Sequence, residues 1–172
     1  PSVVYGFFGL IVIVPLIQKL FNLPVGESGL AGSIVLAIMA LPTIITVTED
    51  AMRNCPRAMR EASLALGASQ WQTIYKVVIP YSISGITSGV VLGIGRAIGE
   101  TMAVVMIAGN QPRMPQGILQ GVRTLTTNVV LEMGYATGLH REALIATGVV
   151  LFVFILIINL AFSIIKGKGE KE

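Results

Sequence analysis

Hydrophobic residues in this chain fall into long runs that polar segments separate. The runs from Ser28 to Thr48 and from Ala143 to Ile165 contain no charged side chain. Each exceeds the roughly 18 apolar residues that mark a membrane helix. A soluble helix of that length needs a polar face, which these runs lack. The pattern therefore predicts an integral membrane protein that lies in a lipid bilayer.

Two further apolar stretches are interpreted as spans. Val3 to Ile17 is short for a full crossing at about 15 residues, so either preceding chain completes it or Pro15 ends it early. Tyr81 to Gly109 would measure about 43 Å as one helix at 1.5 Å per residue, which is enough to cross. Together with the two charge-free runs, these stretches predict an all-α membrane protein with about four transmembrane helices.

Two long polar loops, residues 49–80 and 110–141, separate these spans; the last span covers 142–165 and a charged tail follows. Four spans place the 49–80 loop and the tail on one side of the membrane. That side holds seven Lys and Arg residues and the other side four, so the positive-inside rule places the 49–80 loop in the cytoplasm. The seven are Arg53, Arg57, Arg60, Lys76, Lys166, Lys168 and Lys171, and the four are Lys19, Arg113, Arg123 and Arg141.

Composition excludes several other classes of protein. The formal net charge of +3 is small and spread along the chain, so nucleic acid is not expected as a partner. The single cysteine, Cys55, excludes an internal disulfide framework and a cysteine-based metal site, and we expect no metal in this chain. Pro1 leads straight into apolar sequence with no basic leader before it. We therefore interpret residues 1–172 as the C-terminal part of a single transmembrane domain.

The 49–80 loop predicts two short helices. The first has a face of small residues, Ala58, Ala62 and Ala65, and Gly67 is expected to end it. Ser69 and Gln72 match a capping box for the second helix, in which Trp71, Ile74 and Val78 form an apolar stripe that Pro80 should terminate. Two interpretations stay open: these helices dock into a groove on a soluble partner, or they lie on the membrane surface with Trp71 as an interfacial anchor.

The predicted helix from Tyr81 to Gly109 carries two charges near its middle. Gly85, Gly89 and Gly93 repeat every four residues, which favours close packing against another helix. Arg96 and Glu100 continue the same face. Charged side chains inside a membrane usually face a partner or a pathway. They are therefore candidates for a substrate pathway in which Arg96 meets an anion and Glu100 holds or releases Arg96; the alternative is a structural ion pair.

The spacing in the 49–80 loop resembles a family motif. Glu61-Ala62-Ser63, three residues, Gly67, nine residues and then Val77-Val78-Ile79-Pro80 is similar to the EAA loop of ABC-importer permeases, a type I (MetI-like) fold. In that family the loop is the coupling helix that docks on a cytoplasmic ATPase dimer. The resemblance implies that this contact is made by Glu61, Ala62, Gly67, Trp71 and Pro80.

A narrower resemblance concerns the substrate. Residues 1–9, the segment Arg96-Ala97-Ile98-Gly99-Glu100-Thr101-Met102-Ala103 and the run 123–134 resemble the phosphate-importer permeases. The resemblance implies a bacterial inner-membrane subunit that transports phosphate together with a sister permease, the ATPase dimer and an extracytoplasmic phosphate-binding protein. It maps the arginine and glutamate of the family motif onto Arg96 and Glu100.

The resemblance also implies where ATP is hydrolysed. The sequence contains no Gly-x-x-x-x-Gly-Lys-Ser/Thr motif, so ATP and Mg²⁺ are expected on the partner ATPase, with no cofactor in this chain. Two rivals stay open: a permease for another oxyanion such as sulfate or molybdate, and a membrane-embedded enzyme that uses Glu100 as acid or base. The lack of a second convergent nucleophile, metal cluster or histidine counts against the enzyme.

Overall fold

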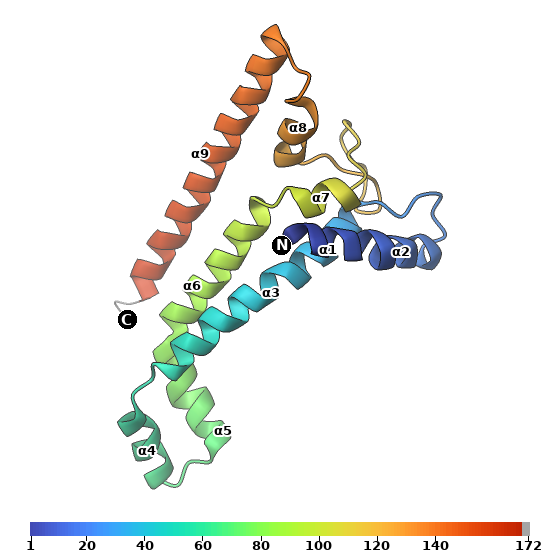
Figure 1. The fold of residues 1–172 in the computed structure, drawn as a ribbon. Helices are drawn as coiled ribbons and strands as arrows, with labels where there is room; N and C mark the ends of the chain where they lie inside the picture. The colour runs from blue at the N-terminus through green and yellow to red at the C-terminus, as the bar shows by residue number, and fades with distance from the viewer. Residues whose placement is uncertain (170–172) are drawn as a thin grey trace. The chain divides into compact units, whose positions relative to one another are not determined.

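The computed structural model describes residues 1–169 and is helical throughout that range, apart from turns and one isolated bridge between Gly109 and Val122 (Figure 1). The last three residues of the predicted charged tail lie outside the described residues. The elements in chain order are α1 (Ser2–Phe8), a π-helix (Gly9–Ile13), α2 (Val14–Leu20), α3 (Gly29–Arg53), α4 (Arg57–Ala65), α5 (Gln70–Thr73), a second π-helix (Ile74–Val78), α6 (Ile79–Ile98), α7 (Met102–Ile107), α8 (Leu125–Glu132) and α9 (Gly138–Gly169).

Four stretches of the described chain are long and apolar enough to cross a membrane. They are Ser2–Leu20, Gly29–Arg53, Gln70–Ile98 and Gly138–Ile164. The predicted number of spans is confirmed, and the fold is an all-α membrane fold. The predicted boundaries were wrong at several ends, because helices continue into segments that the sequence marked as polar loops.

The longest such extension is at the 49–80 loop. Helix α3 continues to Arg53, where the guanidinium donates to the Glu49 carboxylate one turn earlier at 2.6 Å. Oppositely charged residues at this spacing support a helix end. Together with the helical stretch that begins at Gln70, this reduces the loop to α4 and its flanking turns, residues 54–69. The last span likewise begins early, at Gly138 instead of residue 142.

Neither Pro15 nor Pro80 ends its helix; the sequence predicted an end at Pro80 and left an early end at Pro15 as one of two alternatives. A proline inside an α-helix lacks the N–H donor and clashes with the carbonyl of the preceding turn. In both places a five-residue π-helix precedes the proline, Gly9–Ile13 before Pro15 and Ile74–Val78 before Pro80. The wider turn changes the hydrogen-bond register ahead of the ring. The helical stretches therefore run on to Leu20 and to Ile98.

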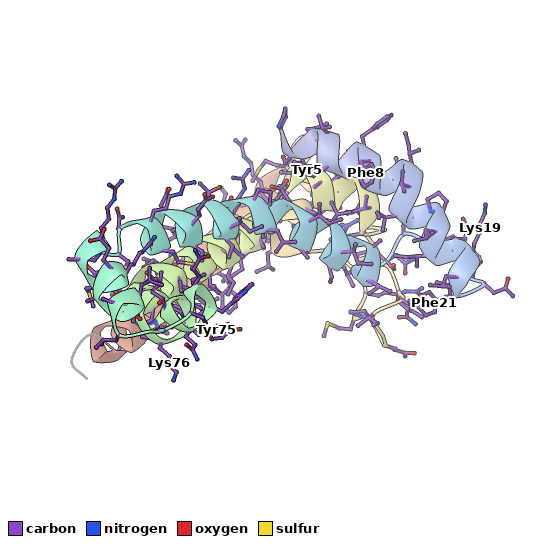
Figure 2. The ribbon with its side chains drawn as sticks, turned by 90° about the horizontal axis from the view of Figure 1, so that it is seen from below. Tyr5, Phe8, Lys19, Phe21, Tyr75 and Lys76 are labelled. Carbon is purple, nitrogen blue, oxygen red and sulfur yellow. The ribbon has the colours of Figure 1, made fainter. Side chains whose placement is uncertain are left out.

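The described chain divides into two compact units, which we treat separately. The first comprises Pro1–Ala40 and Arg96–Ile157. Its core is formed by buried side chains of the N-terminal helices, the start of α3 and α7: Val14, Ile17, Ala31, Val35, Ala103 and Ile107. Tyr5 packs against this core, whereas Phe8 is exposed and points away from it (Figure 2). The start of α3 is held by backbone hydrogen bonds from Gly29 to Gln120 and from Leu30 to Ile118.

The second unit comprises Leu41–Gly95 and the described residues from Ile158 onward. It contains the later turns of α3, the α4–α5 hairpin and most of α6. Ser82 of α6 donates a hydrogen bond to the main-chain carbonyl of Ala51 in α3 at 3.0 Å, although 31 residues separate them in sequence. This bond satisfies a buried hydroxyl and fixes the register between α3 and α6 near the hairpin.

Candidate functional site

The α4–α5 hairpin is built from local signals that the sequence carries. Gly67 adopts a φ of +86° after α4 and confirms the predicted helix end, since a left-handed backbone favours glycine. Ser69 accepts a hydrogen bond from the Gln72 amide, and the Gln72 side chain accepts one from the Ser69 amide. The predicted capping box is therefore confirmed. The hydroxyls of Ser63 and Thr73 lie 3.0 Å apart and join the two helices of the hairpin.

Four of the residues predicted to contact a partner lie on the surface of this hairpin, and the fifth, Pro80, is exposed in α6. Trp71 is 74% exposed, and Glu61 and Ala62 are also exposed. The alanine face is uncovered over its whole length, at Ala58, Ala62 and Ala65. Tyr75 and Lys76 also project outward, in the π-helix that follows α5 (Figure 2).

The apolar stripe predicted for the second helix does not form one face. Val78 is only 3% exposed, whereas Trp71 points to the surface. The π-helix at Ile74–Val78 separates the two positions and changes the register on which the prediction relied. Trp71 therefore belongs to the exposed surface, and Val78 to the interior of the second unit.

An apolar groove of about 790 Å³ lies behind the hairpin, within the second unit. Its walls come from the later turns of α3, from α4, from α5 and from the π-helix that follows α5, and they include Ile45, Met52, Leu64 and Ile74. Arg60 lines the groove and donates to the main-chain carbonyl of Met52, which ties α4 to the end of α3. The hairpin is thus attached to a membrane-length helix by a charged hydrogen bond.

The three glycines of the predicted packing face lie on α6. A Cβ at Gly85 would lie 2.3 Å from the Cβ of Ala51 in α3, and one at Gly89 would lie 3.2 Å from the Cβ of Val47. Gly93 is buried in the same helix. The first two glycines therefore let the backbones of α3 and α6 approach closely, as small residues do between membrane helices.

The helix expected from Tyr81 to Gly109 is interrupted, which corrects the sequence interpretation. Helix α6 ends at Ile98 and α7 begins at Met102, so Gly99, Glu100 and Thr101 are not helical. Glu100 is consequently outside the helix whose face it was expected to continue.

The two charges lie where two helix ends meet. Arg96 is exposed and occupies the last turn of α6, where a cation interacts favourably with the negative end of the helix dipole. The Glu100 carboxylate accepts a hydrogen bond from the Ala103 amide at 3.1 Å and so satisfies a free donor in the first turn of α7. Opposite charges at adjoining helix ends are a local reason for the break, and no periodicity signals it.

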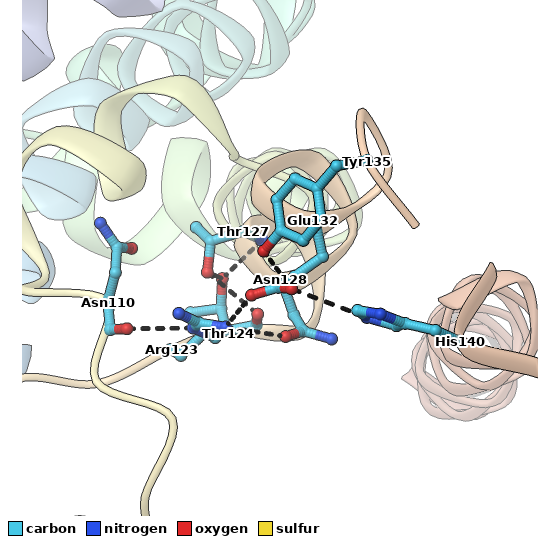
Figure 3. Close-up of polar contacts among 8 residues, drawn as sticks. All are labelled: Asn110, Arg123, Thr124, Thr127, Asn128, Glu132, Tyr135 and His140. Carbon is cyan, nitrogen blue, oxygen red and sulfur yellow. Dashed lines mark hydrogen bonds and ion pairs between the residues drawn. The ribbon is translucent and has the colours of Figure 1, made fainter. Parts of the chain in front are cut away.

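A polar network centred on Arg123 lies beside this break in the first unit (Figure 3). The Arg123 guanidinium donates to the Glu132 carboxylate at 2.7 Å, and both side chains are less than one-fifth exposed. Arg123 also donates to the main-chain carbonyl of Asn110 at 3.0 Å. Tyr135 donates from its hydroxyl to Glu132, and the His140 imidazole lies 3.6 Å from the same carboxylate.

These contacts shift two pKa values in opposite directions. The hydrogen bond from Tyr135, followed by that from Arg123, holds the pKa of Glu132 below its ordinary value of 4.5. The same hydrogen bond is the main reason that the pKa of Tyr135 is raised above its ordinary value of 10.0, because removing the proton would place two negative charges together. Glu132 is therefore an ionised partner of Arg123 throughout the neutral range.

The pattern of residues along the chain does not predict this network. The signal in the sequence is a pair of threonines three residues apart, Thr124 and Thr127. The Thr124 hydroxyl caps α8 by accepting a hydrogen bond from the Thr127 amide. Asn128 and Glu132 follow at i and i+4 on that helix. The described residues contain no group of three or more His, Cys, Asp or Glu side chains able to hold a metal ion.

Comparison with known proteins gives the family. The family described as "binding-protein-dependent transport system inner membrane component" matches residues 1–168. The chain is 46% identical over 165 residues to a probable ABC transporter permease protein, YqgH, of Bacillus subtilis, covering 92% of the chain and 53% of the relative. It is 34% identical over 171 residues to the phosphate transport system permease protein PstC of Pasteurella multocida, covering 88% of the chain and 53% of the relative.

A third relative is the phosphate transport system permease protein PstC 1 of Mycobacterium tuberculosis, 40% identical over 141 residues, which covers 79% of the chain and 42% of the relative. The chain thus spans about half the length of the curated relatives it matches. No solved structure matches it. With four membrane-length helices in the described residues and a family match over almost its whole length, this multi-pass membrane chain belongs to the inner-membrane component family of binding-protein-dependent transport systems.

Proposed function

We propose that this chain is part of a permease subunit of an ATP-driven importer of inorganic phosphate. In this proposal the chain forms part of the pathway along which the anion crosses the membrane. The observation that supports phosphate as the substrate is the similarity of this chain to PstC permeases over most of the chain's length. The subunit lies in the bacterial cytoplasmic membrane beside a sister permease. An extracytoplasmic phosphate-binding protein delivers the anion, and a cytoplasmic ATPase dimer supplies the energy.

The exposed α4–α5 hairpin supports the coupling part of this proposal. The exposed side chains of Glu61, Ala62 and Trp71 are available to a soluble partner. The hairpin that carries them follows α3 directly along the chain. Helical stretch Gln70–Ile98 connects this surface to Arg96 without interruption. When the ATPase dimer closes, the hairpin moves with it and this helical stretch carries the displacement into the membrane, as alternating access requires.

The α6–α7 break supports the pathway part. Non-helical backbone at membrane depth is tolerated where it is buried in protein or lines a water-filled cavity, and intramembrane charges mark substrate routes. Arg96 supplies a guanidinium that can bind two phosphate oxygens at once. Glu100, whose carboxylate accepts a hydrogen bond from the Ala103 amide at the start of α7, stabilises the break beside it and limits how long an anion stays, because like charges repel.

The chain uses no cofactor of its own in this proposal, and it is not an enzyme; ATP and Mg²⁺ bind to the partner ATPase. The proposal is tested by uptake of labelled phosphate in cells that lack their own importer and that receive the full-length permease with its partners. We expect uptake that requires an active ATPase and continues in excess sulfate or molybdate. Absence of uptake, or uptake that excess sulfate abolishes, would contradict the phosphate assignment.

A further inference from the structure

One hydrogen bond connects the Arg123 network to the α6–α7 break. The hydroxyl of Thr126 in α8 donates to the main-chain carbonyl of Glu100 at 3.1 Å, although 26 residues separate them in sequence. A side-chain donor on the backbone of a non-helical residue restricts the position of that residue directly. The path of the chain at Glu100 therefore depends on where α8 lies.

One ion pair joins the two ends of α8, and the Arg123 of that pair also holds the helix to the chain after α7. Arg123 immediately precedes Thr124, the cap of α8, and Glu132 is the last residue of the helix. Their 2.7 Å contact links the segment before the helix to its final turn. Arg123 extends the link to the chain after α7 through the Asn110 carbonyl. A helix of eight residues held in this way cannot rotate without breaking a charged hydrogen bond.

The Arg123–Glu132 pair does more than stabilise α8. The two charged side chains are 19% and 18% exposed, so removing them from water offsets part of what the pair contributes to stability. Thr124 already caps the helix by itself. The ion pair gives α8 a defined orientation. This orientation places the Thr126 hydroxyl against the main-chain carbonyl of Glu100.

We propose that Arg123, Glu132 and Thr126 are positioning residues for the substrate pathway. The ion pair orients α8 so that Thr126 holds the backbone at Glu100, and this keeps the α6–α7 break in the shape that admits the anion. None of the three residues contacts the substrate in this account. The inference rests on the proposed function for its transport readout, but the geometric part can be measured without any substrate.

The first test is a double-mutant cycle in the full-length permease assembled with its partners. Thr126→Val keeps the shape of the side chain and removes the donor, so the initial rate of phosphate uptake should fall roughly fivefold, as expected for one lost hydrogen bond. Glu132→Gln should lower the rate by a similar factor. If the ion pair acts through Thr126, the double variant should be no slower than the slower single variant, within about twofold.

Two control variants keep this test interpretable. Thr126→Ser retains the hydroxyl and should transport at close to the unmodified rate. Thr147→Val makes the same chemical change in α9, where the hydroxyl bonds only within its own helix, and should also have no effect. Independent effects that multiply to roughly 25-fold in the double variant would overturn the proposal, because they would indicate two separate roles.

The second test measures backbone hydrogen exchange in the same complexes without substrate. Thr126→Val and Glu132→Gln should each raise exchange severalfold in the segment from Ile98 to Ala103, whereas Thr147→Val should not. Unchanged exchange there would overturn the inference whatever the transport result. If the unmodified importer takes up no phosphate but exchange changes as expected, the proposed substrate fails and the positioning role stands.

Discussion

Gly85 of α6 lies so close to Ala51 of α3 that a Cβ at residue 85 would be 2.3 Å from the Cβ of Ala51. Real Cβ atoms do not approach so closely, so any side chain at this position requires the backbones to move apart. The contact is also near the Ser82 hydrogen bond to the Ala51 carbonyl. It therefore defines the separation of the two membrane-length helices that flank the hairpin.

The first prediction follows from this contact. Gly85→Ala should destabilise the permease by about 1–3 kcal/mol, the usual cost of overpacking a close contact. Gly95→Ala is the matched control. Gly95 lies in the same helix as Gly85, and a Cβ at Gly95 would meet nothing within 4 Å. Thermal unfolding of the assembled complex in detergent measures both. Equal unfolding midpoints for the two variants would refute the close approach of α3 and α6.

The second prediction concerns the turn at Gly67. Its φ of +86° is strained for any residue with a Cβ, and nothing lies within 4 Å of that site. Gly67→Ala should therefore cost about 1 kcal/mol through backbone strain alone. Gly67→Asn should cost less, since asparagine tolerates the left-handed conformation better.

Misplacing this turn should affect coupling more than assembly. We expect Gly67→Ala to lower the number of phosphate ions transported per ATP hydrolysed, with Gly67→Asn intermediate between Gly67→Ala and the unmodified protein. The ratio of uptake to ATPase activity in reconstituted vesicles measures this. A full ratio in Gly67→Ala would argue against a role of the turn in transmitting motion.

The capping box gives a third prediction. Ser69→Ala removes the acceptor for the Gln72 amide and should destabilise the start of α5 by about 1 kcal/mol. Ser69→Asp keeps an acceptor and should restore stability. Hydrogen exchange of residues 70–75 reports the effect locally. The cap would be irrelevant to this helix if exchange in Ser69→Ala matched that of Ser69→Asp.

The fourth prediction is a pH dependence of the Arg123 network. The folded pKa of Glu132 is lowered, so the stability that its ionised form contributes is fully present above pH 4.5 and is lost as the pH falls through the lowered pKa. For Tyr135 the sign is reversed. Its raised pKa means that its contribution is present below pH 10.0 and is lost as the pH rises through the folded value.

Replacing Tyr135 by Phe separates these contributions. Tyr135→Phe removes the largest cause of the lowered pKa of Glu132, so the acid-side loss of stability should be smaller and complete at a higher pH, and the alkaline-side loss should disappear. Unfolding midpoints measured across the pH range test this. Identical pH profiles for Tyr135→Phe and the unmodified protein would contradict the assigned hydrogen bond.

Local features of the structure could be predicted from the sequence, and the non-local ones could not. The four spans, the Ser69 and Gln72 cap and the bend at Gly67 depend on residues within a few positions of one another. The break at Glu100 depends also on Thr126, which approaches from α8, 26 residues away. No periodicity within 81–109 contains that information.

The helix boundaries at Pro15 and Pro80 illustrate a second limit. The sequence predicts a helix end at Pro80 and allows one at Pro15, but a π-helix accommodates the ring in both places. That solution costs only a local change of register when tertiary packing compensates. The Arg123 network was missed for a similar reason, because its members come from loop, α8 and α9 and are brought together only by the fold.

In the proposed mechanism the anion passes Arg96 at the α6–α7 break on its way through this subunit. Arg96→Gln in the full-length permease, assembled with its partners, tests it most directly through labelled-phosphate uptake, subunit assembly and ATPase activity. We expect loss of uptake with normal assembly and retained ATPase activity. Full uptake would remove Arg96 from the mechanism, and loss of assembly would make it a structural residue.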